Sequence, residues 1–259
     1  MNKASTTVSV VIPAYNAEKT LPKTLNSVLE QTLPPLEIIV IDDCSADNTA
    51  AIVAEYAARD SRLLYRKNEK NAGVSHSRNV GVAMASGEWI AFLDSDDCWT
   101  PEKLEHQLAA AQKDPTCAFL FTASAFMDQD GCPMTGVFSV AERVTRRELL
   151  KQNIISCSSV LIKRDLMIRH PMRDGTKMHE DFAAWLDVLS DTPFAMGVNE
   201  PLLVYRIQST SKSGNRWKSL LMAWRTYRAV QISPIATIYY MCFNVTRSMK
   251  KYKNIKKKV

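Results

Sequence analysis

The chain has 259 residues, of which 46% are apolar and 23% charged. These proportions exclude a globally disordered protein and are typical of one large α/β domain with an appendage. No segment has the roughly 18 uninterrupted apolar residues of a membrane-spanning helix. The first seven residues are polar, unlike a signal peptide, so we expect a cytoplasmic location. Six scattered cysteines without ligand-like spacing indicate neither a zinc site nor a disulfide framework.

The net charge of +6 combines an acidic body with a basic end. Residues 201–259 contain 13 Lys and Arg and no Asp or Glu, whereas residues 1–200 contain 20 basic and 27 acidic side chains. Such a basic end favours an anionic partner, either a membrane surface or nucleic acid. Because the body is acidic and lacks interleaved aromatic residues, we expect no nucleic acid and predict an anionic membrane surface. A merely solvated tail is the alternative.

The first hundred residues alternate between short β-branched runs and segments with apolar residues at helical spacing. This alternation predicts βαβ units, hence an α/β fold with a mostly parallel central sheet flanked by helices. The predicted strands are 8–12, 38–41, 63–65 and 89–93, with helices after the first two and over about 75–85.

Several of these strands end in acidic residues. Ligands of open α/β sheets bind beyond the carboxyl ends of the strands. We therefore expect Asp42, Asp43, Asp94, Asp96 and Asp97 to project from one rim of the sheet.

The regular alternation fails after the first half of the chain. Thr100 and Pro101 predict a helix start, and Asp130 with Gly131 predicts a turn. The other elements expected here are helices at 101–113, 146–153 and 180–189 and strands at 117–126 and 158–163.

The C-terminal stretch, residues 216–252, has a helical pattern with a break expected near Pro234. Its apolar part, residues 232–245, is too short to span a membrane. Because it contains Tyr239 and Tyr240 and precedes a basic run, it is typical of an interfacial helix. A helix pair packed onto the core is an equally weighted alternative.

The segment Asp94-Ser95-Asp96-Asp97 follows an apolar strand, which holds several carboxylates close together. Their mutual repulsion makes such a cluster costly unless a cation is present. Mg²⁺ and Mn²⁺ bind through one or two carboxylates together with substrate phosphates. The segment therefore predicts a site for a metal and a diphosphate.

A second acidic cluster follows the strand at 38–41. Asp42 and Asp43 stand at the strand tip, where a carboxylate can accept a hydrogen bond from a base edge or a ribose hydroxyl. Asp47 or Asn48 can instead be a simple N-cap of the helix that follows.

Five motifs follow one another along the chain: Pro13-Ala14-Tyr15-Asn16, Asp42-Asp43-Cys44-Ser45, Asn71 to Asn79, Asp94-Ser95-Asp96-Asp97 and His179-Glu180-Asp181. In this order they resemble family 2 glycosyltransferases, over roughly residues 8–210. The resemblance implies a GT-A fold, with a nucleotide-sugar-binding half (1–100), an acceptor half (101–210) and, beyond it, a basic amphipathic helical tail (211–259).

The resemblance also implies roles for individual residues. Pro13, Ala14 and Tyr15 would lie along the nucleoside, and Asp43 would accept a hydrogen bond from uracil. Arg78 would lie near the nucleotide. Asp94, with Ser95 beside it, would touch the ribose or the metal, and Asp96 would be the main ligand of Mn²⁺ or Mg²⁺.

By the same resemblance, Asp181 is the catalytic base. Glu180 and Trp185 of its helix, with Arg206 from a late loop, would support the acceptor side. The competing interpretation is that Glu180 and Asp181 only complement the helix dipole. Gln208 stands where family members often have histidine, which weakens the case for a phosphate contact from that loop; packing of Tyr205 and solvation of Arg206 is the alternative there.

These observations predict an inverting glycosyltransferase that uses a nucleotide-diphosphate donor, expected to be a UDP-sugar. The acceptor would be a glycan hydroxyl, expected to be lipid-linked, in cell-surface polysaccharide synthesis, with the enzyme peripheral at the inner face of the membrane. The alternatives are a polyprenyl-phosphate sugar synthase, which needs no base, and a non-catalytic nucleotide-sugar-binding scaffold.

Overall fold

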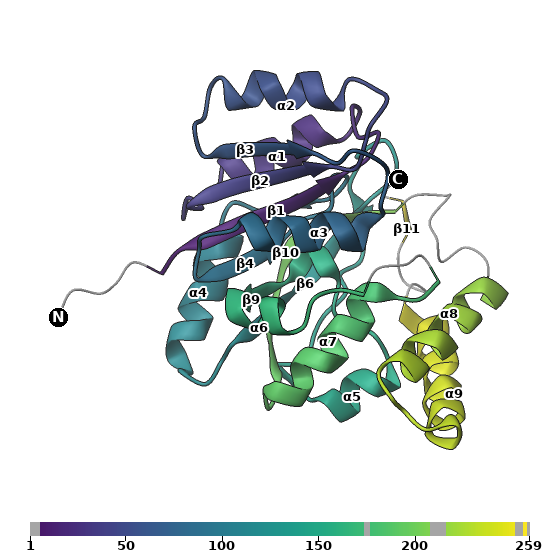
Figure 1. The fold of residues 1–259 in the computed structure, drawn as a ribbon. Coiled ribbons are helices and arrows are strands. Elements are labelled where there is room, and N and C mark those ends of the chain that lie inside the picture. The colour runs from purple at the N-terminus through teal and green to yellow at the C-terminus, as the bar shows by residue number, and fades with distance from the viewer. Residues whose placement is uncertain (1–5, 174–176, 208–215, 252–255, 258–259) are drawn as a thin grey trace.

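The computed structural model describes residues 6–173, 177–207, 216–251 and 256–257. A twisted central sheet carries helices on both faces, and two C-terminal helices, α8 (Arg216–Ala229) and α9 (Pro234–Lys251), lie beside its lower end in Figure 1. The predicted α/β fold with a C-terminal helical extension is confirmed. The expected break near Pro234 is also confirmed, since α9 begins there.

The N-terminal half forms the predicted βαβ units. Its strands pair in parallel in the order β3-β2-β1-β4. The elements are β1 (Val8–Ala14), α1 (Leu21–Leu29), β2 (Glu37–Asp42), α2 (Thr49–Ala57), β3 (Leu63–Lys67), α3 (Val74–Met84) and β4 (Trp89–Phe92).

The other half of the sheet mixes strand directions. The short strand β9 (Leu161–Lys163) lies antiparallel between β4 and β6 (Phe119–Met127), so β6 runs in the same direction as β4. The long strand β10 (Ala195–Arg206) lies parallel to β6, while β5 (Cys98–Trp99) and β8 (Arg143–Val144) pair with β10 in antiparallel fashion. The long strands of the sheet therefore all point the same way.

Strand β10 is absent from the sequence prediction. Its register with β6 shifts between Val198 and Leu203, where Asn199, Glu200 and Pro201 interrupt the apolar pattern. Polar residues with a proline are typical of a turn, and only a bulge allows the strand to continue through them.

Smaller differences separate prediction and structure. Residues 157–159 form a 3₁₀ turn where the start of a strand was expected, and α4 begins at Lys103, after the predicted Thr100–Pro101 start. The remaining elements are α4 (Lys103–Lys113), β7 (Met134–Thr135), α5 (Arg146–Lys151), α6 (Arg164–Arg169), α7 (Glu180–Asp191) and β11 (Lys256–Lys257), which pairs with β7.

Two apolar cores sandwich the sheet. Successive residues of β2 alternate between them, with Ile38 and Val40 facing one core and Ile39 and Ile41 the other, as the two-residue period of a strand requires. Helices α1, α2 and α4 cover the first core, and α3 and α5 to α8 cover the second. Because both faces are covered, the polar groups at the strand ends remain as the accessible part of the sheet.

Trp185 of α7 is a core residue. Its side chain is fully buried and its ring centroid lies 5.1 Å from that of Phe119 and 6.1 Å from that of Phe92. The indole has no exposed surface, so Trp185 can support the acceptor side only indirectly, by fixing α7 against the sheet.

Replacing Trp185 with alanine should lower the free energy of unfolding by about 3–5 kcal/mol, because the truncation leaves a cavity between α7 and the sheet. Urea denaturation followed by circular dichroism measures this loss. Leu221→Ala, at a half-exposed position of α8, is the control, with an expected change within about 0.5 kcal/mol. Equal stability of the two variants would contradict the assigned packing.

The helix α8 is docked on the domain. The Tyr227 hydroxyl donates to the carbonyl of Leu150 at 2.7 Å, and the Tyr227 ring makes an edge contact with Phe182 at 5.6 Å. The His179 amide donates to Thr226 Oγ1 at 2.9 Å. The alternative of a packed helix pair is thus confirmed for α8. Among the helices of the described ranges, none has the length and apolarity to cross a bilayer.

Candidate functional site

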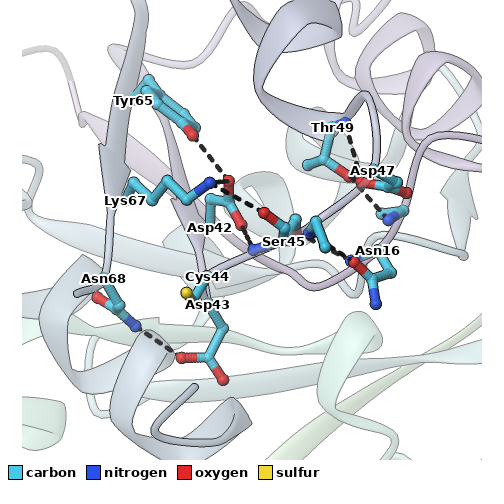
Figure 2. A network of polar contacts seen from close by, with 12 residues as sticks. Asn16, Asp42, Asp43, Cys44, Ser45, Asp47, Thr49, Tyr65, Lys67 and Asn68 are labelled. Atoms are coloured by element: carbon cyan, nitrogen blue, oxygen red, sulfur yellow. Dashed lines mark hydrogen bonds and ion pairs between the residues drawn. The ribbon is translucent and has the colours of Figure 1, made fainter. Parts of the chain in front are cut away.

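The polar residues at the ends of β1, β2 and β4 lie at one rim of the sheet. Parallel strands bring their carboxyl ends together, which is why motifs distant in sequence become neighbours. Figure 2 shows the first part of this rim, where the loop after β1 meets the loop after β2.

Asp42 is a structural anchor of the β2 loop. Its carboxylate is fully buried and accepts hydrogen bonds from the Ser45 amide and the Tyr65 hydroxyl, each at 2.7 Å (Figure 2). Burial and this bond to a carboxylate raise the pKa of Tyr65. The Lys67 ammonium lies 4.0 Å from the same carboxylate and donates to the Ser45 carbonyl. Both Asp42 oxygens are therefore engaged within the protein and not offered to a base or ribose.

Asp43 holds the loop that leads into α3. It accepts hydrogen bonds from Asn68 Nδ2 (2.8 Å), the Ala72 amide (2.9 Å) and the Gly73 amide (2.7 Å). Burial favours the neutral acid, but these donors outweigh it and lower the pKa of Asp43. Gly73 has φ +93°, a conformation that favours glycine. Asp43 thus stays ionised at the rim, with capacity to accept a further bond.

The loops after β1 and β2 are cross-linked. The Asn16 amide donates to Ser45 Oγ, and the Ala46 amide donates back to Asn16 Oδ1, both at 2.9 Å (Figure 2). Asn48 is the N-cap residue of α2 but makes no side-chain cap bond; the Asp47 carboxylate, one residue earlier, accepts from the Thr49 amide and from the Glu18 amide. Asn16 has a positive φ of 48°, which these bonds hold in place.

The first sequence motif presents Tyr15 and Asn16 to solvent. Pro13 and Ala14 are buried at the end of β1, whereas Tyr15 is 53% exposed. An exposed ring beside the rigid cross-linked loops offers a flat surface to a planar ligand.

Arg78 reaches the rim from α3. It is buried, and its guanidinium lies 2.5 Å from an oxygen of Asp94, which follows β4. Burial disfavours the cation, but Asp94 and, more weakly, Asp181 favour it, so that the pKa of Arg78 is raised. A permanent positive charge therefore lies among the carboxylates of the rim.

The carboxylates after β4 differ in accessibility. Asp94 and Asp96 are partly exposed, while Asp97 is buried and accepts from Ser158 Oγ at 2.6 Å and from the Arg206 amide at 2.8 Å. Burial raises the pKa of Asp97 well above the usual carboxyl value, and the charges of Asp96 and Asp94 add to this effect. Asp97 therefore positions the loop, whereas Asp94 and Asp96 face the rim.

Arg206 ties three loops together. Its Nε donates to the Asp96 carbonyl at 2.8 Å, and its Nη1 donates to the Gln129 carbonyl at 3.0 Å. The residue is buried, at 6% exposure. The alternative that Arg206 stays solvated is therefore wrong: the side chain is buried and supports the Asp96 backbone. Gln208 lies outside the described residues.

The variant Arg206→Met should be less stable than the parent by about 1–3 kcal/mol for each buried carbonyl left unpaired. Chemical denaturation gives this difference. Arg206→Lys is the matched variant and should recover part of the loss, since one ammonium can reach fewer of these carbonyls. Equal loss in both variants would contradict the assigned support of the loop.

Asp181 stands in the first turn of α7 and is partly buried. One of its oxygens accepts from the Phe182 amide at 2.7 Å. Burial raises the pKa of Asp181, Arg78 opposes that shift and Glu180 adds to it. Glu180 is buried beside it. The rim therefore gathers carboxylates from the end of β4 and from the start of α7 around one arginine.

Tertiary contacts place further residues here that local sequence did not indicate. Cys157 is buried in the 3₁₀ turn before β9, next to Ser158, and burial raises the pKa of its thiol, with Asp94 and Asp181 adding to this shift and Arg78 opposing it. Ser158 also donates to Asp97 and accepts from the Asp94 amide at 3.1 Å. Neither stands in a recognisable motif, because their position depends on β9 inserting beside β4.

The acidic rim suits a divalent cation bound together with a diphosphate. Within the described ranges, no group of three or more His, Cys, Asp and Glu side chains is arranged to hold a metal alone. Mg²⁺ and Mn²⁺ need only one or two carboxylates when phosphates supply other ligands. Asp96 fits that requirement, because it is partly exposed on the loop after β4, which Arg206 supports, and Asp94 belongs to the same loop.

Comparisons with known proteins agree with this geometry. The profile of glycosyl transferase family 2 matches residues 9–169. TuaG of Bacillus subtilis (strain 168), a glycosyltransferase assigned to teichuronic acid biosynthesis, is 38% identical over 86% of this chain and 88% of its own. The Escherichia coli enzyme WfgD, named UDP-Glc:alpha-D-GlcNAc-diphosphoundecaprenol beta-1,3-glucosyltransferase, is 34% identical over 96% of this chain and 98% of its own.

Solved structures share the fold. Residues 1–349 of S. aureus TarS, in complex with UDP-GlcNAc, superpose with a TM-score of 0.74, covering 94% of this chain and 73% of that one at 22% identity. The mannosyltransferase PcManGT from Pyrobaculum calidifontis, with GDP-Man and Mn²⁺, gives a TM-score of 0.68 at 18% identity, over 95% and 69% of the two chains. Because the family profile covers more than half of the sequence, the chain belongs to glycosyl transferase family 2.

Proposed function

We propose that this glycosyltransferase transfers a sugar from a UDP-sugar to a hydroxyl of a lipid-linked glycan, with inversion at the anomeric carbon. The observation that carries the proposal is the convergence of Asp94 and Asp181, from separate elements, on the buried Arg78. A donor site and a base meet there at the rim of one sheet.

Three features support a UDP-sugar as donor. Tyr15 offers an exposed ring for a base, and the ionised Asp43 can accept a hydrogen bond from a pyrimidine N–H. The WfgD name specifies UDP-Glc, and TarS is solved with UDP-GlcNAc. Pro13 and Ala14 then form the rigid strand end behind the nucleoside, and Arg78 holds Asp94 and its neighbour Ser95 near the ribose.

Asp96, assisted by Asp94, would hold Mn²⁺ or Mg²⁺ against the diphosphate. When bound, such a cation stabilises the negative charge of the departing nucleotide without proton transfer. Two hydrogen bonds hold the loop after β4 in place before the donor binds: Arg206 Nε donates to the Asp96 carbonyl, and the Arg206 amide donates to the Asp97 carboxylate.

Asp181 would act as the base. It takes the proton of the acceptor hydroxyl while the oxygen forms a bond to the anomeric carbon and the bond to the nucleotide breaks. Because one base acts opposite the leaving group, a single displacement inverts the anomeric centre, as in inverting glycosidases. Glu180, buried beside Asp181, supports the start of α7.

The acceptor would be lipid-linked and the enzyme peripheral at the cytoplasmic face of the membrane. The WfgD name describes a diphosphoundecaprenol acceptor. The 13 Lys and Arg of residues 201–259, with no acidic side chain among them, complement anionic headgroups, at about 1 kcal/mol for each basic residue near the surface. The reaction would serve cell-surface polysaccharide synthesis, such as O-antigen, capsule or exopolysaccharide.

Isothermal titration of the purified chain with UDP, GDP and CDP, each with and without Mn²⁺, tests the donor assignment. We expect metal-dependent binding of UDP and weaker binding of the other two. Preference for GDP would contradict a UDP-sugar as donor and redirect the search to another nucleotide-sugar. If no nucleotide binds, the proposed function is overturned, and so is the alternative of a non-catalytic nucleotide-sugar-binding scaffold.

A further inference from the structure

The exposed face of α9 is unusually apolar. Ile235 is 84% exposed, Ile238 58% and Tyr239 53%, and Cys242 is exposed as well. Their spacing of three, four and seven residues places them on one side of the helix, which we call the α9 stripe. A helix on a protein surface normally turns charged or polar residues outward, so this face requires an explanation.

The opposite face of α9 already packs on the domain. Thr237 is fully buried, and Tyr240 and Met241 pack against the core that α7 and α8 also cover. The Tyr240 ring stacks on Tyr227 at 6.2 Å. The α9 stripe is therefore not the face by which the helix packs on the domain, and it remains exposed although the opposite face is buried.

Aromatic rings extend the apolar surface of the stripe. The Tyr239 ring makes edge contacts with Phe243 at 5.0 Å and with Tyr240 at 5.2 Å. Residues 235–243 include no charged residue. A tyrosine with an apolar body and a polar tip is typical of the boundary between acyl chains and headgroups.

The charge around the stripe decides which partner it fits. Arg228 of α8 is exposed and donates to the carbonyl of Ile232, just before α9, and residues 201–259 carry no Asp or Glu. Two copies of the chain that met through this face would bring like charges together, whereas an anionic bilayer would attract them. The stripe thus combines apolar side chains with surrounding positive charge, as interfacial helices do.

We propose that the α9 stripe inserts into the acyl boundary of an anionic membrane and fixes the enzyme there at a set orientation. This inference rests on the proposed function, and it specifies how the enzyme binds the membrane. It adds a hydrophobic component, which salt does not screen, to the electrostatic attraction of the basic tail. Since α9 packs onto the domain, insertion would orient the whole molecule and not a loose tail.

Flotation with phosphatidylglycerol-containing vesicles tests the hydrophobic component. At about 0.5 M NaCl, where charges are screened over a few ångströms, the full chain should stay bound. Ile235→Asn/Ile238→Asn should weaken that binding at least about tenfold, given the free energy of burying each isoleucine. Ile168→Asn, at an isoleucine of α6 with about the exposure of Ile238, should bind like the parent. Release of the parent chain by salt, or parent-like binding of the double variant, would overturn the inference.

A fluorescent label provides a readout that needs no destabilising substitution. The chain has two exposed cysteines, Cys242 on the stripe and Cys132 elsewhere, and Cys44 is half-exposed. In the variant Cys44→Ser/Cys132→Ser, an environment-sensitive dye is attached to Cys242. The emission of this dye should shift to shorter wavelengths when vesicles are added. The same dye on Cys132, with Cys242→Ser, should not. A shift at both sites or at neither overturns insertion by the stripe.

Titration with UDP separates this inference from the proposed function. All α9 variants should bind UDP like the parent, because the substituted side chains lie on the exposed face of α9, opposite the face that packs on the domain. Normal UDP binding without vesicle insertion would disprove the α9 inference alone, whereas a parent chain that binds no nucleotide disproves the proposed function. The parent chain can also be tested for self-association without vesicles. If it self-associates and Ile235→Asn/Ile238→Asn does not, the stripe is a protein interface, and its assignment to lipid is overturned.

Discussion

Asp181→Asn should lower the turnover number for sugar transfer by about 10²–10⁴-fold, the range expected when a general base is removed. Asparagine keeps the shape and the bond to the Phe182 amide but cannot take the acceptor proton. UDP binding should remain unchanged, because Asp181 is assigned to the acceptor and not to the donor. Turnover measured at saturating donor and acceptor, together with UDP titration, separates these effects.

The matched control is Glu180→Gln, which alters the neighbouring carboxylate of the same helical turn. It should affect turnover far less than Asp181→Asn, since Glu180 is assigned no proton transfer. Parent-like turnover in Asp181→Asn would contradict the assignment of a base and favour the polyprenyl-phosphate sugar synthase, whose acceptor is already ionised.

The pH profile of the parent provides a second check on Asp181. A base works in its deprotonated form, so turnover rises as the pH increases through its pKa. Burial raises that pKa in spite of Arg78, so the acid limb of the profile should lie above the usual aspartate range of about 3.9. In Asp181→Asn, the residual activity should lose this limb.

Asp96→Ala should abolish the metal-dependent part of UDP binding and, with it, sugar transfer. A cation held by one or two carboxylates loses its main protein contact when Asp96 is truncated. Without the cation, the diphosphate faces the remaining carboxylates of the rim, where Arg78 is already paired with Asp94, and this repulsion disfavours binding of an anion. Titration of UDP with and without Mn²⁺ measures the loss, and the two curves of the variant should coincide.

Glu105→Ala is the control for Asp96→Ala, because it removes a carboxylate of α4 that bonds to Thr32 away from the rim. It should leave the Mn²⁺ dependence intact. If Asp96→Ala retains the full metal dependence, another residue holds the cation and the assignment of Asp96 is wrong. Thermal unfolding of both variants checks that the fold is kept.

Local sequence determined the architecture of the first half and the nature of the site. Uninterrupted β-branched runs can only be buried strands, and acidic residues at their ends must then lie at the sheet rim. For this reason the strands at the start of the chain, and the grouping of Asp43, Asp94 and Asp96 at one rim, could be predicted without coordinates, whereas the place of Arg78 came only from the family resemblance.

Only the tertiary structure decided how the acidic residues divide their tasks. Asp42 and Asp97 have the same side chain as Asp96, and nothing local marks them as buried anchors. Their partners, Tyr65 and Ser158, belong to other elements, and β10 needs a bulge to bring Arg206 under the Asp96 loop. Trp185 is likewise of a residue type that is common in binding sites, but the tertiary structure places it in the core.

The same division holds for the C-terminal helices. Sequence by itself determined that they are basic, helical and broken near Pro234, because these properties depend on composition and on one missing amide donor. Which face of α9 is buried depends on the shape of the α5 and α8 surface it meets. The apolar residues on both faces have no periodic signal that separates docking from exposure, so only packing could assign Thr237 inward and Ile235 outward.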